Sequence, residues 1–189
     1  MLLVTGITGH SGRYFLEELI KNKYKGHIRC IVRETSDTSI LDDIGLNIEK
    51  VVGDLDDQKF VNKAMIGVDT VMHIASIFCS VNLIKAAVKN NVNRAILVHT
   101  TGIYSKYKSA SEDYKNIELN IENIIKESNS KISIIYLRPT MIYGYANDRN
   151  MIVFIKMVDR LRLFPIIPME KVCYSRLMEE ILVRLIIKY

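Results

Sequence analysis

The sequence contains few cysteines, and their spacing excludes the usual zinc and disulfide arrangements. Only three occur among its 189 residues, Cys30, Cys79 and Cys173, and no two of them form a CxxC pair. A sparse, odd number of cysteines is typical of a protein in a reducing compartment. We therefore expect a cytoplasmic protein without a metal site.

The sequence also lacks a long apolar segment. No stretch approaches the ~18 consecutive apolar residues that a membrane-spanning helix needs. At the start of the chain, Gly6 and Gly9 interrupt the apolar residues before they could form the core of a secretion signal. The sequence therefore predicts neither a membrane anchor nor a membrane partner.

Positive charge is only slightly in excess and is scattered along the chain. The sequence has 26 Lys and Arg residues against 21 Asp and Glu residues, which gives a net charge of +5. No basic stripe carries interleaved aromatic side chains, so nucleic acid is not an expected partner. We interpret most of this charge as solvated helix surface, while part of it can attract an anionic cofactor or substrate.

Short β-branched apolar runs alternate with amphipathic segments along most of the chain, which is typical of βαβ units and a parallel sheet. The expected strands span residues 2–5, 28–32, 48–52, 68–75, 95–100 and 132–137. The expected helices begin near Ser11, span 35–44 (a short helix or a turn), follow a cap at Asp56 or Asp57 and end near Gly67, and span 81–89 and 111–128. This alternation predicts one domain with a doubly wound, Rossmann-type α/β fold.

A glycine-rich segment follows the first expected strand directly and leads into an amphipathic helix. Such a turn presents backbone N–H groups at a helix N-terminus, whose partial positive charge favours a diphosphate. Gly6 permits the tight turn, Gly9 lets the backbone approach a ligand, and Gly12 lets the helix pack close to the strand. The sequence therefore predicts a dinucleotide site that includes Gly6, Thr8, Gly9, His10, Ser11 and Gly12.

The TGxxGxxG spacing of this segment resembles the short-chain dehydrogenase/reductase superfamily, in the extended or atypical branch that includes nucleoside-diphosphate-sugar epimerases and dehydratases. The resemblance extends over residues 1–168, which we expect to form an NAD(P)-binding domain. Four further segments match in order: Gly53-Asp54-Leu55, His73-Ile74-Ala75, Thr100-Thr101-Gly102-Ile103-Tyr104, and Leu137-Arg138-Pro139 with Ile142-Tyr143-Gly144. The resemblance implies that the cofactor contacts Asp54, Leu55, Ile74, Ala75, Arg138 and Pro139.

The residues after the second expected strand bear on which dinucleotide binds. A carboxylate at this position binds the ribose diol of NAD, whereas an arginine accepts the 2′-phosphate of NADP. Arg33 and Glu34 stand here side by side, and Arg33 directly follows the strand, as in atypical members. Arg13 is either a second cation for the phosphate or a solvated helix residue. We favour NADP, with NAD as the alternative.

The resemblance implies a catalytic Ser or Thr, and a Tyr followed four residues later by a Lys. Thr100 and Tyr114 occupy the first two positions, but Glu118 stands where the lysine is expected. A lysine stabilises the phenolate form of the tyrosine, and a carboxylate acts in the opposite direction. Lys115 does not replace it, because the adjacent residue points about 100° away around the helix. The expected Tyr-Lys pair is therefore degenerate, and a chemical role for Thr100 stays open.

The resemblance stops after Pro168. Residues 169–189 predict one amphipathic helix, in which Leu177, Ile181 and Leu185 recur at every fourth position. We interpret this helix as a remnant or replacement of a substrate domain, in a truncated gene product or a naturally short protein. Its apolar face would be exposed or would pair with another copy. The resemblance also implies a homodimer through residues 81–89 and 111–128.

Three functions stay open on this evidence. The first is an NAD(P)-dependent epimerase, dehydratase or reductase that acts on a small molecule such as a nucleotide sugar. The second is a non-catalytic dinucleotide sensor that controls a partner, and the third is an inactive fragment. Thr100, Tyr114 and the Arg138-Pro139 match favour the enzyme, whereas Glu118 and the short C-terminus favour the sensor.

Overall fold

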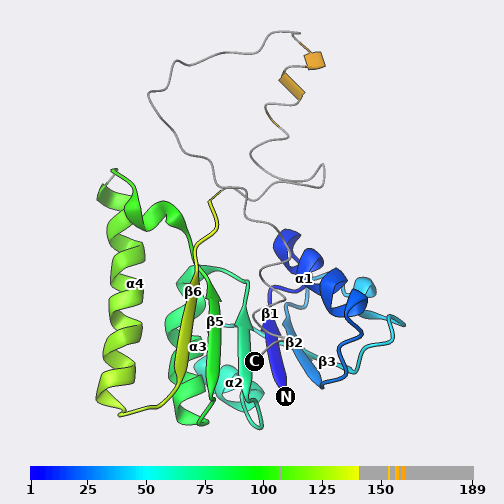
Figure 1. Cartoon of the computed structure of the whole chain (residues 1–189), viewed down its shortest axis with the longest axis horizontal. Helices are drawn as coiled ribbons and strands as arrows, with labels where there is room; N and C mark the ends of the chain where they lie inside the picture. The colour runs from blue at the N-terminus through cyan, green and yellow to red at the C-terminus, as the bar shows by residue number, and fades with distance from the viewer. Residues whose placement is uncertain (107, 141–152, 154–155, 158, 161–189) are drawn as a thin grey trace.

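The computed structural model describes residues 1–106, 108–140, 153, 156–157 and 159–160. A six-stranded sheet forms its centre (Figure 1), in the order β3-β2-β1-β4-β5-β6 with parallel neighbours. The strands are β1 (Leu2–Thr5), β2 (Ile28–Val32), β3 (Ile48–Val52), β4 (Thr70–His73), β5 (Arg94–Val98) and β6 (Ser133–Leu137). This order confirms the predicted doubly wound fold, and it places the reversal of strand order between β1 and β4.

The described part of residues 1–140 contains four α-helices. They are α1 (His10–Lys21), α2 (Gln58–Ala64), α3 (Ser80–Lys89) and α4 (Lys108–Glu127). The cap of α2 is Asp57 and not Asp56, because its carboxylate accepts hydrogen bonds from the N–H groups of Lys59 and Phe60. This bond satisfies backbone donors that a helix start leaves without a partner.

The expected element at 35–44 is mostly turn, with a short 3-10 helix at Ser39–Leu41. The carboxylate of Asp37 accepts hydrogen bonds from both the N–H and the hydroxyl of Ser39. Side-chain bonds of this kind compete with helical backbone bonds. The expected fourth strand is also shorter than 68–75, because residues 74 and 75 leave the ladder after Ile74 N–H bonds to the Thr5 carbonyl.

The apolar core forms two layers, one on each face of the sheet. In β1, Leu2 and Val4 face α1, whose Phe15, Leu16 and Leu19 cover that side. The alternate residue Leu3 faces the opposite layer, which α2, α3 and α4 cover. The central strands are therefore buried on both faces, as expected for a parallel sheet.

Several predictions fall on residues outside the described part. These are the match at Ile142-Tyr143-Gly144 and the helix at 169–189. Within the described part, no helix combines the length and the apolar character that crossing a membrane requires. The two helices named for a homodimer, α3 and α4, pack against each other on one face of the sheet, and a dimer through them stays a prediction.

Candidate cofactor and reaction site

The predicted site residues gather at one edge of the sheet. Each follows the carboxyl end of a strand or belongs to the loop or helix that comes next, in the case of Tyr114 the helix α4. Carboxyl ends of parallel strands share one edge, and ligands of doubly wound sheets bind in the crevice where the strand order reverses. In this sheet the strand order reverses between β1 and β4, so a ligand is expected beside the segments that follow these two strands.

The turn between β1 and α1 is packed too tightly for side chains at two of its glycines. Gly6 has a φ of +76°, and a Cβ there would lie 2.7 Å from the backbone nitrogen of Ala75. A Cβ at Gly12 would lie 2.1 Å from the carbonyl oxygen of Gly6. The positive φ and both close approaches require glycine, so these residues let the turn pack against α1 and the segment after β4.

Gly9 caps the start of α1 without offering a side chain. It is exposed, and a Cβ there would approach only the Gly6 carbonyl oxygen, at 3.2 Å. The first turn of α1 contains no acidic residue. The helix end therefore keeps its partial positive charge beside an accessible backbone, and this cradle fits a dinucleotide diphosphate.

The side chain of His73 connects the end of β1 to the loop after β4. Its Nδ1 lies 2.6 Å from Oγ1 of Thr5, and its Nε2 lies 3.0 Å from the carbonyl oxygen of Ser76. A carbonyl only accepts, so Nε2 carries the proton and Nδ1 accepts from the Thr5 hydroxyl. Burial lowers the pKa of His73 to about 4, so the ring is neutral near pH 7. It fixes the end of β1 relative to the loop after β4.

Two arginines flank the segment after β2. Arg33 and Glu34 are both exposed, and the Arg33 carbonyl accepts a hydrogen bond from Ser36. Arg13 donates from Nε to the Thr8 carbonyl at 3.4 Å. Hydrogen bonds from Ser39 lower the pKa of Asp37, and the charge of Arg13 adds to this effect. Arg13 therefore lies near the segment that begins with Arg33.

The segments after β3 and β4 carry the residues expected to contact the cofactor. Asp54 is exposed, and its Oδ1 accepts a hydrogen bond from the N–H of Asp56. Leu55 packs against the core layer below α2 and α3. Ile74 packs against the opposite layer, and Ala75 lies against Gly6. Their places agree with a cofactor site, and their contacts with a cofactor stay a prediction.

The two expected catalytic residues meet across Gly102, in the 3-10 turn at Thr101–Tyr104. Oγ1 of Thr100 accepts a hydrogen bond from the N–H of Gly102 at 3.0 Å. A Cβ on Gly102 would lie 2.9 Å from Cε2 of Tyr114 and 3.3 Å from Oγ1 of Thr100. The ring of Phe78, which is 62% exposed, lies 6.1 Å from the Tyr114 ring between centroids. The turn thus brings a hydroxyl and a phenol ring to one point.

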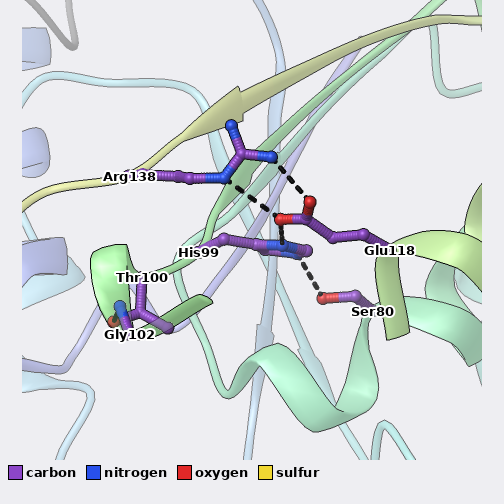
Figure 2. A network of polar contacts seen from close by, with 6 residues as sticks. All are labelled: Ser80, His99, Thr100, Gly102, Glu118 and Arg138. Atoms are coloured by element: carbon purple, nitrogen blue, oxygen red, sulfur yellow. Dashed lines mark hydrogen bonds and ion pairs between the residues drawn. The ribbon is translucent and has the colours of Figure 1, made fainter. Parts of the chain in front are cut away.

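Glu118 lies one turn after Tyr114 and is buried within a polar network (Figure 2). Its Oε1 accepts from His99 Nδ1 at 2.9 Å and from Arg138 Nε at 3.2 Å. Its Oε2 accepts from Arg138 Nη2 at 2.6 Å. Burial lowers the pKa of His99, against the opposing effect of Glu118. With His99 neutral, its Nδ1–H donates to Glu118, and its Nε2 accepts from the Ser80 hydroxyl at 3.2 Å.

The carboxylate that stands in place of the expected lysine is therefore already paired. Arg138 holds both of its oxygens, and Glu118 in turn raises the pKa of Arg138. The guanidinium of Arg138 also lies over the ring of Tyr136, 5.1 Å from its centroid. Glu118 thus joins α4 to the segment after β6.

Sequence reasoning missed Ser80 and His99 and gave Glu118 no partner. One signal pointed to His99: Ala95 and Leu97 face the layer under α3 and α4, so the residue two positions on faces the same way. A polar residue on an apolar face requires a buried partner. No comparable signal marks Ser80, which is the first residue of α3.

The fold and the glycine cradle define a dinucleotide-binding protein of the Rossmann class. A family model described as NAD(P)H-binding matches residues 6–154, and the chain belongs to this family. The predicted NAD(P) cofactor is thereby confirmed at the level of the family.

Known proteins match the chain over parts of their length. Sterol demethylase protein B of Methylococcus capsulatus is 38% identical over 74 residues, which are 39% of this chain and 21% of that protein. The structure of MoeE5 with UDP-glucuronic acid and NAD matches at a TM-score of 0.61 with 18% identity, over 82% of this chain and 60% of that one. Triphenylmethane reductase of Citrobacter sp. with NADP(H) matches at a TM-score of 0.61 with 21% identity, over 82% and 54%. The chain thus corresponds to little more than half of these structures.

Proposed function

We propose that this protein is an NAD(P)H-dependent oxidoreductase that reduces a carbonyl group. The observation that carries the proposal is the approach of Thr100 Oγ1 and the Tyr114 ring across Gly102. This point lies at the same edge of the sheet as the glycine cradle. A substrate oxygen held there would be at the edge where a dinucleotide binds in doubly wound folds.

The chain offers groups for each part of the cofactor. The cradle formed by Gly6, Gly9 and the start of α1 would hold the diphosphate. Arg33, assisted by Arg13, would bind the 2′-phosphate of NADP, which favours NADPH over NADH. Arg138 and Pro139 would lie toward the nicotinamide end. When bound, the reduced nicotinamide supplies the hydride.

Thr100 and Tyr114 would act on the substrate oxygen. Because the Thr100 oxygen accepts the Gly102 N–H, its own hydrogen is available for donation to a carbonyl oxygen. Tyr114 would donate a second hydrogen bond and then its proton, as the carbonyl becomes an alcohol. Both donors stabilise the negative charge that develops on this oxygen.

The residue at position 118 bears on whether Tyr114 acts first as an acid or as a base. Oxidation of an alcohol requires a base, and a tyrosine serves as a base when a neighbouring cation stabilises its phenolate. The helix instead supplies Glu118, whose charge Arg138 neutralises. A reduction starts from the Tyr114 phenol, and the phenolate that remains after proton transfer must take a proton from solvent before the next turnover. An epimerase or dehydratase that begins by oxidising its substrate needs the tyrosine as a base at the start of every turnover, so we propose the reductase ahead of them.

The substrate class to test first is a nucleoside-diphosphate keto-sugar. One structural neighbour is described with UDP-glucuronic acid, and the exposed ring of Phe78 beside Tyr114 offers a surface on which a sugar or an aromatic ring could stack. Another neighbour is a triphenylmethane reductase, so flat aromatic acceptors belong in the same panel.

The first experiment is titration calorimetry of the purified chain with NADPH and NADH. We expect tighter binding of NADPH, and loss of binding in Gly9→Asp, which places a carboxylate in the diphosphate cradle. Turnover is then followed by the loss of NADPH absorbance with the substrate panel. Tyr114→Phe should lower turnover about 100-fold or more with unchanged cofactor affinity. Tyr104→Phe, at an exposed tyrosine of the same turn, is the matched control.

A second candidate is a dinucleotide sensor, favoured by the absence of a lysine at position 118. A sensor would bind the cofactor and leave every carbonyl of the panel unreduced. Wild-type protein that binds NADPH tightly, turns over nothing, and is indistinguishable from Tyr114→Phe would favour the sensor and contradict the reductase. A folded protein that binds neither nucleotide would contradict both.

A further inference from the structure

The polar network around Glu118 has no place yet in the proposed reduction. We infer that Glu118 is a positioning residue, which holds the guanidinium of Arg138 at the carboxyl edge of β6 so that Arg138 contacts the nicotinamide half of the bound dinucleotide. The inference rests on the proposed function, because it assumes that the cofactor binds along this edge. Glu118 would then have a role of its own at the position where the resemblance implies a lysine.

The Arg138–Glu118 pair has a geometry that fixes the orientation of the guanidinium. Two different nitrogens of the guanidinium bind the two oxygens of one carboxylate, at 3.2 and 2.6 Å. A fork of this kind fixes the plane of the guanidinium as well as its distance. The Tyr136 ring adds a second constraint from the sheet side. Arg138 is thus held in one orientation from two directions.

Glu118 cannot turn away from Arg138 without breaking other hydrogen bonds. His99 Nδ1 binds the same carboxylate at 2.9 Å, and Ser80 holds the far side of the His99 ring at 3.2 Å. Figure 2 shows the chain of contacts, in which α3, the segment after β5, α4 and the segment after β6 each contribute one residue. Four separate parts of the fold thus converge to orient one cation.

The exposure of the side chains increases along the network toward Arg138. The side chains of His99 and Glu118 are 0% and 11% exposed, whereas that of Arg138 is 27% exposed. The network therefore runs from the core toward the edge of the sheet and ends in its only strongly cationic group. The hydroxyl of Thr101 lies 3.5 Å from the Pro139 carbonyl, which connects this edge to the turn that carries Thr100.

The Ser80–His99–Glu118 order resembles a hydrolytic triad, but its burial excludes that chemistry. Ser80 is 0% exposed, so no substrate can reach its hydroxyl. The network therefore orients the guanidinium of Arg138 and does not activate the hydroxyl of Ser80.

A purely structural role is the alternative, and the chain contains a matched pair for testing it. Arg29 donates from Nε to Glu49 at 2.8 Å, and its Nη1 binds the carbonyls of Ala64 and Ile66. This pair joins neighbouring elements as the Arg138–Glu118 pair does. It lies near the amino ends of β2 and β3, at the edge of the sheet away from the proposed cofactor.

The test compares Glu118→Gln with Glu49→Gln in the full chain. Calorimetry gives the Kd of NADPH and of 2′,5′-ADP, which lacks the nicotinamide half. We expect Glu118→Gln to weaken NADPH about tenfold and to change 2′,5′-ADP by less than about twofold. Glu49→Gln should change neither. Arg138→Gln should match Glu118→Gln, and the double variant should add little, because both remove one interaction.

Arg138→Lys covers the case in which Glu118→Gln does not fold. It keeps the charge and the ion pair but loses the fork, and it should weaken NADPH selectively. Equal losses for NADPH and 2′,5′-ADP, or no loss for either, would overturn the inference and leave the proposed reductase standing. Wild-type protein that binds neither nucleotide would instead overturn the proposed function, and the inference with it.

Discussion

The carboxyl edge of the sheet has two halves: a backbone half between β1 and β4, and a side-chain half between β5 and β6. Between β1 and β4 the site consists of backbone, and its shape depends on the absence of side chains at Gly6 and Gly12. Between β5 and β6 it consists of side chains, and its shape depends on a buried network that includes Glu118 and Arg138. The first half suits any diphosphate, and the second carries the groups that we propose act on a substrate oxygen.

The two buried histidines show the same contrast. His73 belongs to the first half and bonds only to uncharged groups, the Thr5 hydroxyl and the Ser76 carbonyl. His99 belongs to the second half and bonds to a carboxylate. We therefore expect the free energy of unfolding to respond to added side-chain volume in the backbone half and to removed side-chain charge in the side-chain half. This difference can be tested one half at a time.

The largest expected effect is that of Gly12→Ala, which adds volume to the backbone half. The new Cβ would lie 2.1 Å from the Gly6 carbonyl oxygen and 2.5 Å from that of Ile7, both backbone atoms. Neither can move without shifting the turn or α1, so we expect the free energy of unfolding to fall by about 3 kcal/mol. Urea unfolding measures this loss.

Gly9→Ala is the matched control for that prediction. Its Cβ would meet only the Gly6 carbonyl oxygen, at 3.2 Å, and its φ of −77° suits alanine. The free energy of unfolding should change by less than about 1 kcal/mol. Equal destabilisation by the two variants would contradict the view that tight packing at Gly12 shapes this half.

The next effect concerns charge in the side-chain half. Glu118→Ala would leave Arg138 and His99 without their shared carboxylate, and loss of one partner of a largely buried ion pair costs about 3 kcal/mol. Glu49→Ala removes a carboxylate whose side chain is 40% exposed, and should cost less than about 1 kcal/mol. Urea unfolding of both variants checks the comparison. If they lose the same stability, the network does not differ from a surface ion pair.

The sequence predicts the backbone half well, because its requirements are local. Gly6 lies in the turn after β1 and Gly12 in the first turn of α1, and their spacing between a strand and a helix specifies a close approach. The six strands and their parallel, doubly wound arrangement were likewise predictable, since apolar runs separated by amphipathic segments imply parallel neighbours. The requirements at 35–44 are local as well: Asp37 bonds to Ser39 and favours a turn, which is one of the two alternatives predicted there.

The side-chain half could be predicted only in part. Thr100 and Tyr114 were found by resemblance, but Glu118 was interpreted by what it replaces. Its partner Arg138 follows another strand, 20 residues further on, and no sequence period connects a helix position with that strand end. Pairing of this kind depends on how α4 lies on the sheet, which only the folded chain determines.

His73, in the backbone half, should make the free energy of unfolding depend on pH. His73 is neutral when folded because burial lowers its pKa from 6.5 to about 4. Between pH 4 and pH 6.5 the imidazole of His73 binds a proton in the unfolded chain but not in the folded chain. Protonation therefore favours unfolding in this window: the free energy of unfolding is unaffected by His73 above pH 6.5 and decreases as the pH falls toward 4. Each pH unit within that window should cost about 1.4 kcal/mol. The measurement is urea unfolding as a function of pH, in wild type and His73→Asn.

His73→Asn should show a shallower pH dependence, because an amide does not titrate in this range. It should not abolish the dependence, since burial lowers the pKa of His99 as well. An unchanged slope would mean that His73 is protonated in the folded protein. That result would also remove the argument that Nδ1 accepts from Thr5.

The smallest expected effect is that of Ser80→Ala, at the far end of the side-chain network. The hydroxyl of Ser80 donates to His99 Nε2 at 3.2 Å, and its loss leaves a buried acceptor without that donor, at a cost of about 1 kcal/mol. Ser128→Ala removes an exposed hydroxyl bonded to the Ile124 carbonyl and should cost less. The affinity for NADPH then sharpens the comparison. If Ser80 supports Arg138 through His99 and Glu118, Ser80→Ala weakens NADPH slightly while Ser128→Ala does not, and equal affinities would confine the positioning role to Glu118.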